Sequence, residues 1–366
     1  IGGGPAGYVA AKKAASAGLS TLLVEKEKLG GVCLNEGCVP SKTLLQAAKT
    51  YHHAKHGSVF GVEVEGLNFN FVQAHAHKNQ VMDRMRGGIA GLMKKYKVEV
   101  VKGEAVLQSG LRIRVNGETH EADDVLLCTG SSPLIPPISG IDSKGVVDSS
   151  GILQLEQLPE HLIVIGGGVI GCEFACMYAS VGIPVTVLET LPEICPSLDK
   201  DIAAVLREEL IKKGVDFKLN ARVEAIEQNY VRFTNGVDSE EVRGDLILVA
   251  TGRKPNVNNL GLEELGLDFD PRGVRTDERG ATNIPGLWAA GDVTGQAWLA
   301  HAASRMAEVV VHNILGRDDM IRHDKMPAVV YTSPEVAVVG LTKEDAEARG
   351  LHVKTGRVPM AMNARY

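Results

Sequence analysis

The sequence has few aromatic residues, few cysteines and no long apolar run. Aromatic residues account for 4% of its 366 positions, and it has six cysteines. Six cysteines are too few for a disulfide-built secreted scaffold of this length, so most of them are expected to be reduced thiols. No apolar stretch is long enough to span a bilayer, and no secretory leader opens the sequence. We therefore expect a cytoplasmic location, or the mitochondrial matrix in a eukaryotic cell.

An excess of positive charge is also absent. The formal net charge is −6, with 44% hydrophobic and 23% charged residues. This balance is typical of a folded protein and gives no broad electrostatic reason to bind nucleic acid. The length exceeds what one compact core holds, so two or three domains are expected. Neither nucleic acid nor a membrane is an expected partner.

What the sequence does contain is a duplication. A motif of the form Gly-x-Gly-x-x-Gly precedes a helical stretch and a strand that ends in Glu25, and the same order recurs before Glu189. Each acid comes 18 positions after the last glycine of its motif. The motif glycines are Gly2, Gly4 and Gly7 in the first unit, and Gly166, Gly168 and Gly171 in the second. One such motif is weak evidence, but the whole unit at the same spacing twice is strong.

The residues of this unit suit the binding of a dinucleotide. The glycines let the backbone approach a pyrophosphate at the helix N-terminus, and the acid accepts hydrogen bonds from a ribose. Two units therefore predict two dinucleotides. At the second site Glu189 would repel the 2′-phosphate of NADP, and no arginine follows it, so NAD is favoured.

The duplication extends beyond the glycine motifs. A helical pair is predicted at about 40–56 and 70–96, followed by strands at about 98–102, 111–115 and 124–128. The first series ends in Thr129-Gly130-Ser131 and the second in Thr251-Gly252-Arg253, turns that let the backbone approach a cofactor closely. A helix at about 299–315 comes next, and then a strand-and-helix segment at about 328–358 whose last strand is expected at 352–358.

Cys33 and Cys38 lie in the run GGVCLNEGCVPSK. Gly37 gives the loop between them the freedom to close a reversible disulfide, and Pro40 suits the first turn of a helix. Cys38 then lies at the helix N-terminus, where the helix dipole and Lys42 favour a thiolate. Held against a flavin, that thiolate can donate electrons to the ring, while Cys33 is the better candidate to meet an external dithiol or disulfide.

The remaining cysteines and most histidines are expected to be structural or solvated. The buried cysteines would be Cys128, Cys172, Cys176 and Cys195. No metal-site signature accompanies His52, His53, His56, His75 or His77. We therefore expect no metal site.

With these motifs the sequence resembles the pyridine nucleotide–disulfide oxidoreductase family. The matching segments include GGVCLNEGCVPSK, ATGRKPN, LWAAGDV, LAHAA and YTSPEVAVVG, in the family's order along the whole chain. The resemblance implies an α/β fold with two Rossmann-like dinucleotide-binding domains, for FAD and NAD, and the start of an α+β dimerisation domain. The implied bounds are 1–148 for the FAD domain with its redox disulfide, 149–276 for the NAD domain, 277–325 for a return to the FAD domain and 326–366 for the start of the dimerisation domain.

The resemblance also implies roles for individual residues. Cys33, Cys38, Lys42 and Glu173 would be catalytic, with Glu173 paired to Lys42 near the flavin and the nicotinamide. Besides the first glycine turn, the FAD contacts would be Glu25, Lys42, Gly103, Thr129, Gly130, Ser131, Asp292, Trp298, Leu299, Ala300 and His301. Besides the second, the NAD contacts would be Glu173, Glu189, Val223 and Gly252.

The reaction that the resemblance implies is oxidation of protein-bound dihydrolipoamide through the Cys33–Cys38 disulfide and FAD, with reduction of NAD to NADH. The implied partners are lipoyl domains of 2-oxoacid dehydrogenase or glycine cleavage complexes, and a second copy of the chain in a homodimer. Mercury-reducing and other disulfide-reducing members of the family stay open as alternatives, although Glu189 argues against the NADPH-linked glutathione branch. A silent flavin-binding subunit is a further alternative, against which the intact cysteine pair argues.

The sequence departs from the family pattern in three places. Val32 and Glu36 stand where the family more often has Thr and Val, and neither change removes a group that the chemistry needs. The His-x4-Glu acid–base pair, which the family's partner subunit supplies, is absent, since His352 is the last histidine and position 357 is Arg. We expect the sequence to be a fragment that ends before this pair and that turns over dithiols poorly by itself.

Overall fold

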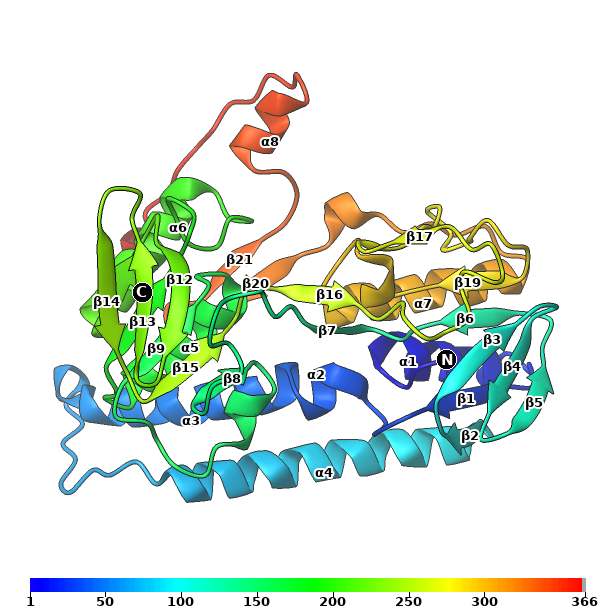
Figure 1. Ribbon diagram of the computed structural model, residues 1–366, viewed down its shortest axis with the longest axis horizontal. Helices are drawn as coiled ribbons and strands as arrows, with labels where there is room; N and C mark the ends of the chain where they lie inside the picture. The colour runs from blue at the N-terminus through cyan, green and yellow to red at the C-terminus, as the bar shows by residue number, and fades with distance from the viewer. Residues whose placement is uncertain (364–366) are drawn as a thin grey trace.

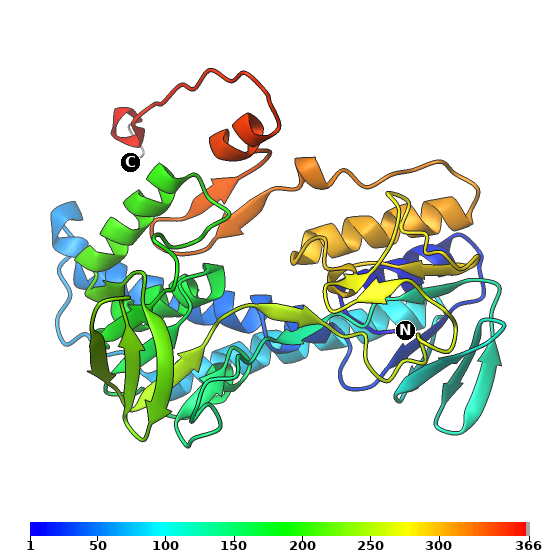
Figure 2. The same ribbon diagram turned by 45° about the horizontal axis from the view of Figure 1, so that its top comes forward.

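The computed structural model describes residues 1–363 and has two lobes that share one long helix (Figure 1). That helix is α4 (Phe71–Lys95), and it runs beneath both lobes. It starts at Asn70, whose side-chain oxygen accepts a hydrogen bond from the backbone N–H of Gln73, as N-cap residues do. Figure 2 shows the last segment, from α8 (Lys343–Ala348) onward, as an arm outside both lobes. The last three positions of the expected dimerisation segment, 364–366, lie outside the described residues.

The first lobe is built around the first glycine unit. β1 (Leu22–Glu25) pairs in parallel with β2 (Glu99–Lys102), and β6 (Val125–Leu127) with β19 (Leu287–Ala289). Ile1 and Gly2 join these pairs, because the Ile1 amino group donates to the Leu126 carbonyl and the Gly2 N–H donates to the Val24 carbonyl, both at 2.8 Å. α1 (Pro5–Ser16) packs against α7 (Ala300–Ile314) through small and aliphatic side chains.

The second lobe is built around the second glycine unit. It holds a parallel five-stranded sheet in the order β11-β10-β9-β15-β8. The strands are β8 (Val146–Asp148), β9 (Leu162–Ile165), β10 (Val185–Leu188), β11 (Val215–Lys218) and β15 (Leu246–Val249). Every residue of β9, β10 and β15 is buried, as in a parallel sheet that is covered on both faces. α5 (Val169–Ser180) packs between this sheet and α3 (Cys38–Lys55), and α6 (Lys200–Lys212) contacts β11.

Each lobe also carries a three-stranded antiparallel sheet. The first contains β3 (Ala105–Gln108), β4 (Arg112–Val115) and β5 (Glu118–Glu121), and the second β12 (Arg222–Glu227), β13 (Tyr230–Thr234) and β14 (Ser239–Arg243). After each Thr-Gly turn comes a short strand, β7 (Ser131–Pro133) or β16 (Arg253–Pro255). These two strands pair antiparallel and bridge the lobes (Figure 1). The duplicated turns are therefore brought side by side.

Most predicted elements are confirmed within two residues at either end. The helical pair lies at 38–55 and 71–95, and the later helix at 300–314. The strand predicted at 352–358 is wrong: residues 351–359 have no regular structure and are exposed, with no neighbouring strand among the described residues to pair with them. The segment before it instead forms a hairpin of β20 (Ala328–Val330) and β21 (Val336–Val338), followed by α8. The short helix α2 (Gly31–Asn35) was not predicted. Within the described part of the chain, no helix has the length and apolar character of a membrane span.

Candidate active site

The two glycine turns form the same hydrogen bonds. The N–H of Gly3 donates to a carboxylate oxygen of Glu25 at 2.6 Å, and the N–H of Gly167 donates to Glu189 at the same distance. In each unit the other carboxylate oxygen accepts a backbone N–H two residues beyond the acid. Both acids are therefore held against their turns at the end of a strand, where a ribose would lie.

The last glycine of each motif is required by close contact. A Cβ on Gly7 would lie 1.7 Å from the carbonyl oxygen of Gly2, and a Cβ on Gly171 would lie 2.0 Å from that of Gly166. No side chain fits at these distances, so the start of each helix packs directly on its own turn. The first residues of α1 and α5 line the cavity, so both helix N-termini lie at the place where an anion would bind.

One cavity of about 1830 Å³ extends along both turns. This volume exceeds that of a pocket for one small ligand, and it suits a site for two dinucleotides. The predicted residues that line it are Gly2, Gly4, Glu25, Cys33, Cys38, Lys42, Gly103, Thr129, Gly130, Ser131, Gly166, Gly168, Glu173, Glu189, Gly252, Asp292, Trp298, Leu299, Ala300 and His301. Gly7 and Gly171 do not line the cavity but pack against the carbonyl groups of Gly2 and Gly166. Val223 does not line the cavity, because its side chain packs beside the buried cluster under β9 and β13.

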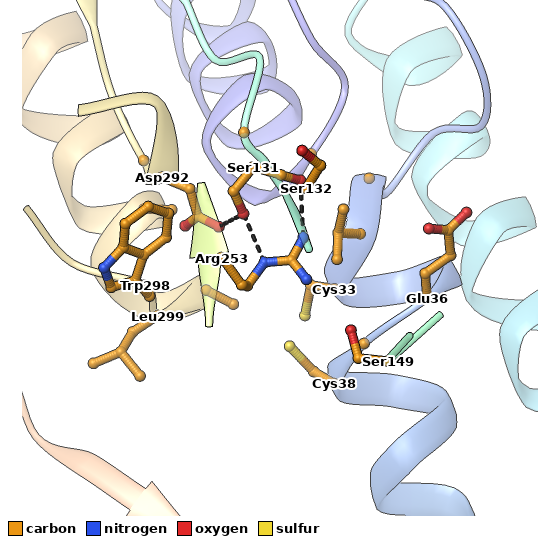
Figure 3. Close-up of a pocket in the computed structure, with 18 of the residues that line it drawn as sticks. Cys33, Glu36, Cys38, Ser131, Ser132, Ser149, Arg253, Asp292, Trp298 and Leu299 are labelled. Atoms are coloured by element: carbon orange, nitrogen blue, oxygen red, sulfur yellow. Dashed lines mark hydrogen bonds between the residues drawn. The ribbon is translucent and has the colours of Figure 1, made fainter. Parts of the chain in front are cut away.

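The cysteine pair lies at the junction of α2 and α3. α3 begins at Cys38, and Figure 3 shows the sulfurs of Cys33 and Cys38 facing one another. A hydrogen bond from the Cys33 thiol, together with the charge of Lys42, lowers the pKa of Cys38 to about 7 despite its burial. The same hydrogen bond and burial raise the pKa of Cys33. Cys38 is therefore the thiol that ionises first, as the helix N-terminus also favours.

Lys42 and Glu173 join α3 to α5 beside this pair. The Lys42 ammonium donates to Glu173 at 2.7 Å, and the other oxygen of that carboxylate accepts the backbone N–H of Tyr331 at 3.0 Å. The Lys42 nitrogen also lies 5.0 Å from the centre of the Tyr331 ring. Glu173 is buried, so its negative charge fixes the direction of Lys42. Three elements thus place one positive charge near Cys38.

A second set of polar contacts lines the cavity and joins Ser131, Arg253 and Asp292 (Figure 3). The Ser131 hydroxyl donates to Asp292 at 2.6 Å, while Arg253 donates to the Ser131 hydroxyl at 2.7 Å and to its carbonyl at 2.8 Å. Burial raises the pKa of Asp292 and lowers the pKa of Arg253. Figure 3 also shows the Arg253 guanidinium between Ser131 and the cysteines.

Sequence reasoning missed several of these contacts. Arg253 was noted in its turn but not as a site residue, although its place directly after Gly252 could have indicated it. Asn256 comes shortly after the second Thr-Gly turn, and its side chain donates to the Thr129 carbonyl of the first turn at 2.9 Å. This hydrogen bond holds the two turns together. Arg86 on α4 donates to Asn35, which lies between the two cysteines, at 2.8 Å. No local sequence pattern predicts these two hydrogen bonds, because the residues that they join are 51 and 127 positions apart in the sequence.

The remaining cysteines and histidines take the structural places expected of them. Cys128, Cys172, Cys176 and Cys195 are buried, which confirms that expectation. His52 lies 3.0 Å from the Lys213 ammonium, and His75 contacts Phe71 and Lys78. Within residues 1–363, no group of three or more histidine, cysteine or acidic side chains is arranged to hold a metal ion.

Comparison with known proteins shows the family. The sequence profile described as "Pyridine nucleotide-disulphide oxidoreductase" matches residues 1–307, and that of the family's dimerisation domain matches 326–366. The chain is 38% identical to a dihydrolipoyl dehydrogenase of Bacillus subtilis, covering 100% of this chain and 81% of the relative. It is 39% identical to that of Chlamydia pneumoniae, covering 98% and 78%.

Two solved structures are also similar. LpdA from Mycobacterium tuberculosis matches with a TM-score of 0.91 and 31% identity, over 100% of this chain and 82% of that one. The HOCl-induced flavoprotein disulfide reductase RclA from Escherichia coli matches with a TM-score of 0.87 and 32% identity, over the same shares.

The chain therefore belongs to the pyridine nucleotide–disulphide oxidoreductase family. It is an oxidoreductase with FAD and NAD as its cofactors, and the expected α/β fold with the start of a dimerisation domain is confirmed. The glycine turns, the acids held against them and the size of the cavity fit both dinucleotides.

Proposed function

We propose that the protein is a dihydrolipoyl dehydrogenase, which oxidises protein-bound dihydrolipoamide to lipoamide and reduces NAD to NADH. The observation that carries this is the Cys33–Cys38 pair, which faces the same cavity as both glycine turns and contains a thiol with a pKa of about 7. The whole-chain identity of 37–39% to several dihydrolipoyl dehydrogenases supports this choice of substrate.

The two cysteines have different tasks in this proposal. Starting from their disulfide, one substrate thiol attacks the sulfur of Cys33, and Cys38 leaves as a thiolate beside Lys42. The second substrate thiol then attacks the mixed disulfide, which closes the lipoamide ring and releases Cys33. Lys42, oriented by Glu173, stabilises the negative charge that forms on Cys38. When bound, FAD supplies the two-electron chemistry that connects the dithiol to NAD.

The remaining predicted residues would hold the cofactors. Near the first turn, Glu25 would bind the adenosine ribose of FAD, and Asp292, oriented by Ser131, would bind the flavin half. Near the second, Glu189 would bind the ribose hydroxyls of NAD. The domain bounds 1–148, 149–276, 277–325 and 326–366 belong to the same proposal, and the two lobes with their connecting strands support them.

We also infer the surroundings in which the protein acts. Its partners would be lipoyl domains of 2-oxoacid dehydrogenase or glycine cleavage complexes, together with a second copy of the chain, which the dimerisation-domain match supports. The location would be the cytoplasm, or the mitochondrial matrix in a eukaryotic cell. The six free thiols are typical of a reducing compartment.

The test is NAD reduction by dihydrolipoamide, measured with the FAD-loaded protein in its dimeric, full-length form. Turnover that depends on both cysteines and prefers NAD to NADP supports the proposal. NAD reduction that survives in Cys33→Ser would contradict it, because the electrons would then bypass the pair.

A second candidate is the reduction of a disulfide at the expense of NADH. The similarity to RclA, described as a flavoprotein disulfide reductase, favours it. The two candidates use the same residues in opposite directions, so the ratio of forward to reverse rates decides between them. A rate with NADH and a small disulfide that far exceeds the rate with dihydrolipoamide and NAD would favour the reductase.

A further inference from the structure

Two buried thiols lie directly beneath the second glycine turn. The sulfurs of Cys172 and Cys195 are 3.7 Å apart, and neither residue is exposed. Cys172 lies in the first turns of α5, directly after Gly171. Cys195 lies in segment 190–198, which comes after Glu189. The pair thus joins the two parts of the chain that surround the proposed NAD ribose.

Backbone hydrogen bonds hold Cys195 toward its partner. Its φ is +46°, in the left-handed region that residues other than glycine seldom adopt. Its N–H donates to the Gly167 carbonyl at 3.0 Å, and its own carbonyl accepts the N–H of Leu198 at 2.9 Å. The thiol of Cys172 donates to the same Gly167 carbonyl at 3.3 Å. Both cysteines therefore share one acceptor within the glycine turn.

The same residue, Gly167, also contacts Glu189. Its N–H donates to the Glu189 carboxylate at 2.6 Å, while its carbonyl accepts from both cysteines, so a displacement of Gly167 reaches this acid through one hydrogen bond. Segment 190–198 contributes Thr190, Leu191 and Ser197 to the cavity wall. The thiol pair, the glycine turn and the cavity wall are thus one packed unit.

The other buried cysteines are not arranged in this way. Cys176 lies one helical turn beyond Cys172, and its sulfur accepts the backbone N–H of Ser333 at 3.3 Å. Cys128 is buried beside the first turn, and no hydrogen bond joins its sulfur to another described thiol. Cys172 and Cys195 are therefore the matched pair, and Cys176 is a natural control.

We propose that Cys172 and Cys195 form an oxidisable thiol pair whose disulfide weakens NAD binding at the second glycine turn. The oxidant is a low-molecular-weight disulfide: two protein thiols and one such disulfide give one protein disulfide and two small thiols. The effect on NAD rests on the proposed function of this turn, whereas formation of the bond does not.

The expected loss of affinity follows from the movement that the bond requires. A disulfide holds its sulfurs about 2.05 Å apart, so the 3.7 Å separation must shrink and the Cys172 thiol stops donating to Gly167. Close-packed interiors transmit such shifts to their neighbours. The disulfide therefore holds segment 190–198 and the glycine turn in positions that differ from those in which Gly167 binds Glu189.

Burial makes this oxidation slow. The hydrogen bond to Cys195 and the surrounding apolar core raise the pKa of Cys172, so little thiolate is present near neutral pH. Equilibration in a redox buffer, rather than brief exposure, is therefore the suitable experiment.

The FAD-loaded, full-length protein is equilibrated in glutathione buffers of graded potential, quenched with acid and alkylated. A glutamate-specific protease cuts after Glu173, Glu189 and Glu193, so Cys172, Cys176 and Cys195 fall on three different peptides. Mass spectrometry should find the peptide of Cys172 linked to that of Cys195. NAD titrations of the same samples should show affinity lowered by about fivefold or more as the linked peptide appears.

Linkage gives a second, independent measurement. If the disulfide weakens NAD binding, saturating NAD must shift the thiol–disulfide equilibrium toward the thiols by the same factor. The affinity of Cys172→Ser and Cys195→Ser should no longer respond to the buffer, whereas Cys176→Ser should respond like the wild type. Should a serine variant fail to fold, Cys195→Ala removes the same bond.

The outcomes that contradict the thiol-pair proposal differ from the one that contradicts the proposed function. A missing link, a link between Cys172 and Cys176, or an intact link with unchanged NAD affinity each overturns the proposal. A reduced protein that binds no NAD contradicts the proposed function instead, and the linked peptide still reports on the thiol pair.

Discussion

The first and second glycine units have the same kind of turn but differ in the segment that comes after the acid. Both hold their acid by a 2.6 Å hydrogen bond and exclude a side chain at the last glycine. After Glu25 the chain forms α2 and α3 with the Cys33–Cys38 pair, whereas after Glu189 it forms segment 190–198, which contains Cys195. In the proposed function, the fold therefore uses the same kind of nucleotide site twice, and the redox chemistry depends on the segment after the first one.

The units differ in burial as well. The central strands of the second sheet are buried throughout, and Glu189 is 7% exposed. Glu25 is only partly buried, and the parallel strands of the first lobe form two-stranded pairs joined through Ile1 and Gly2. We expect the second unit to tolerate less change in its interior, since close-packed cores respond to small changes in volume.

The largest effect should come from the cysteines of the first unit. Cys33→Ser and Cys38→Ser should each lower dithiol-dependent NAD reduction by at least roughly 10⁴-fold, as loss of a nucleophile does. They should differ in colour: the reduced protein should show a long-wavelength charge-transfer band that Cys33→Ser keeps and Cys38→Ser loses. A band that survives in Cys38→Ser would reverse the roles. Cys176→Ser should keep turnover near that of the wild type.

Alanine in place of the last glycine of each motif should weaken the binding of one cofactor and leave the other bound. The added Cβ would lie 1.7 Å from a carbonyl oxygen in Gly7→Ala and 2.0 Å in Gly171→Ala. Relieving such a clash costs about 1–3 kcal/mol, or roughly 5–150-fold in cofactor affinity. Gly7→Ala should lose FAD on gel filtration, whereas Gly171→Ala should keep its flavin and raise the KM for NAD. Gly88→Ala on α4, where a Cβ meets nothing within 4 Å, is the control.

The ribose-facing acids give a smaller effect. Glu189→Ala should shift the ratio of kcat/KM values from NAD toward NADP by about tenfold, because it removes repulsion of the 2′-phosphate. Glu25→Ala is the matched variant in the first unit and should leave that ratio unchanged while loosening FAD. A wild-type protein that already prefers NADP would refute this role of Glu189.

The smallest effect should appear in a pH titration of the cysteine pair. In the reduced protein, alkylation of Cys38 should reach half its maximum rate near its pKa of about 7. Because folding lowers this pKa from 9.0, the thiolate stabilises the folded reduced protein fully above about pH 9, and this contribution is lost as the pH falls through about 7. Cys33→Ala removes the hydrogen bond that is the main cause, so its midpoint should move upward. An unchanged midpoint would show that Lys42 and the helix suffice.

Local patterns carried most of the fold prediction. Apolar periodicity, Pro40 and the glycine motifs located α3, α4 and both nucleotide units, since these signals depend on neighbouring residues alone. The strand predicted at 352–358 is absent because a strand needs a partner, and apolar alternation cannot supply one. α2 escaped prediction because five residues that begin with Gly31, directly after Gly30, carry too little periodicity.

The sequence by itself determined the chemistry: two dinucleotide turns, a preference for NAD, and a thiol pair at a helix start. The family resemblance already implied that Lys42 meets Glu173, but only the tertiary structure decided that Ser131 meets Asp292 and Arg253, that Asn256 meets Thr129, and that Cys172 meets Cys195. The first two of these sets join residues more than 100 positions apart, and even the 23 positions between the last pair span a helix and a strand. Such contacts follow from how lobes and sheets pack, because a motif constrains its own backbone and not the distant surface that comes to face it.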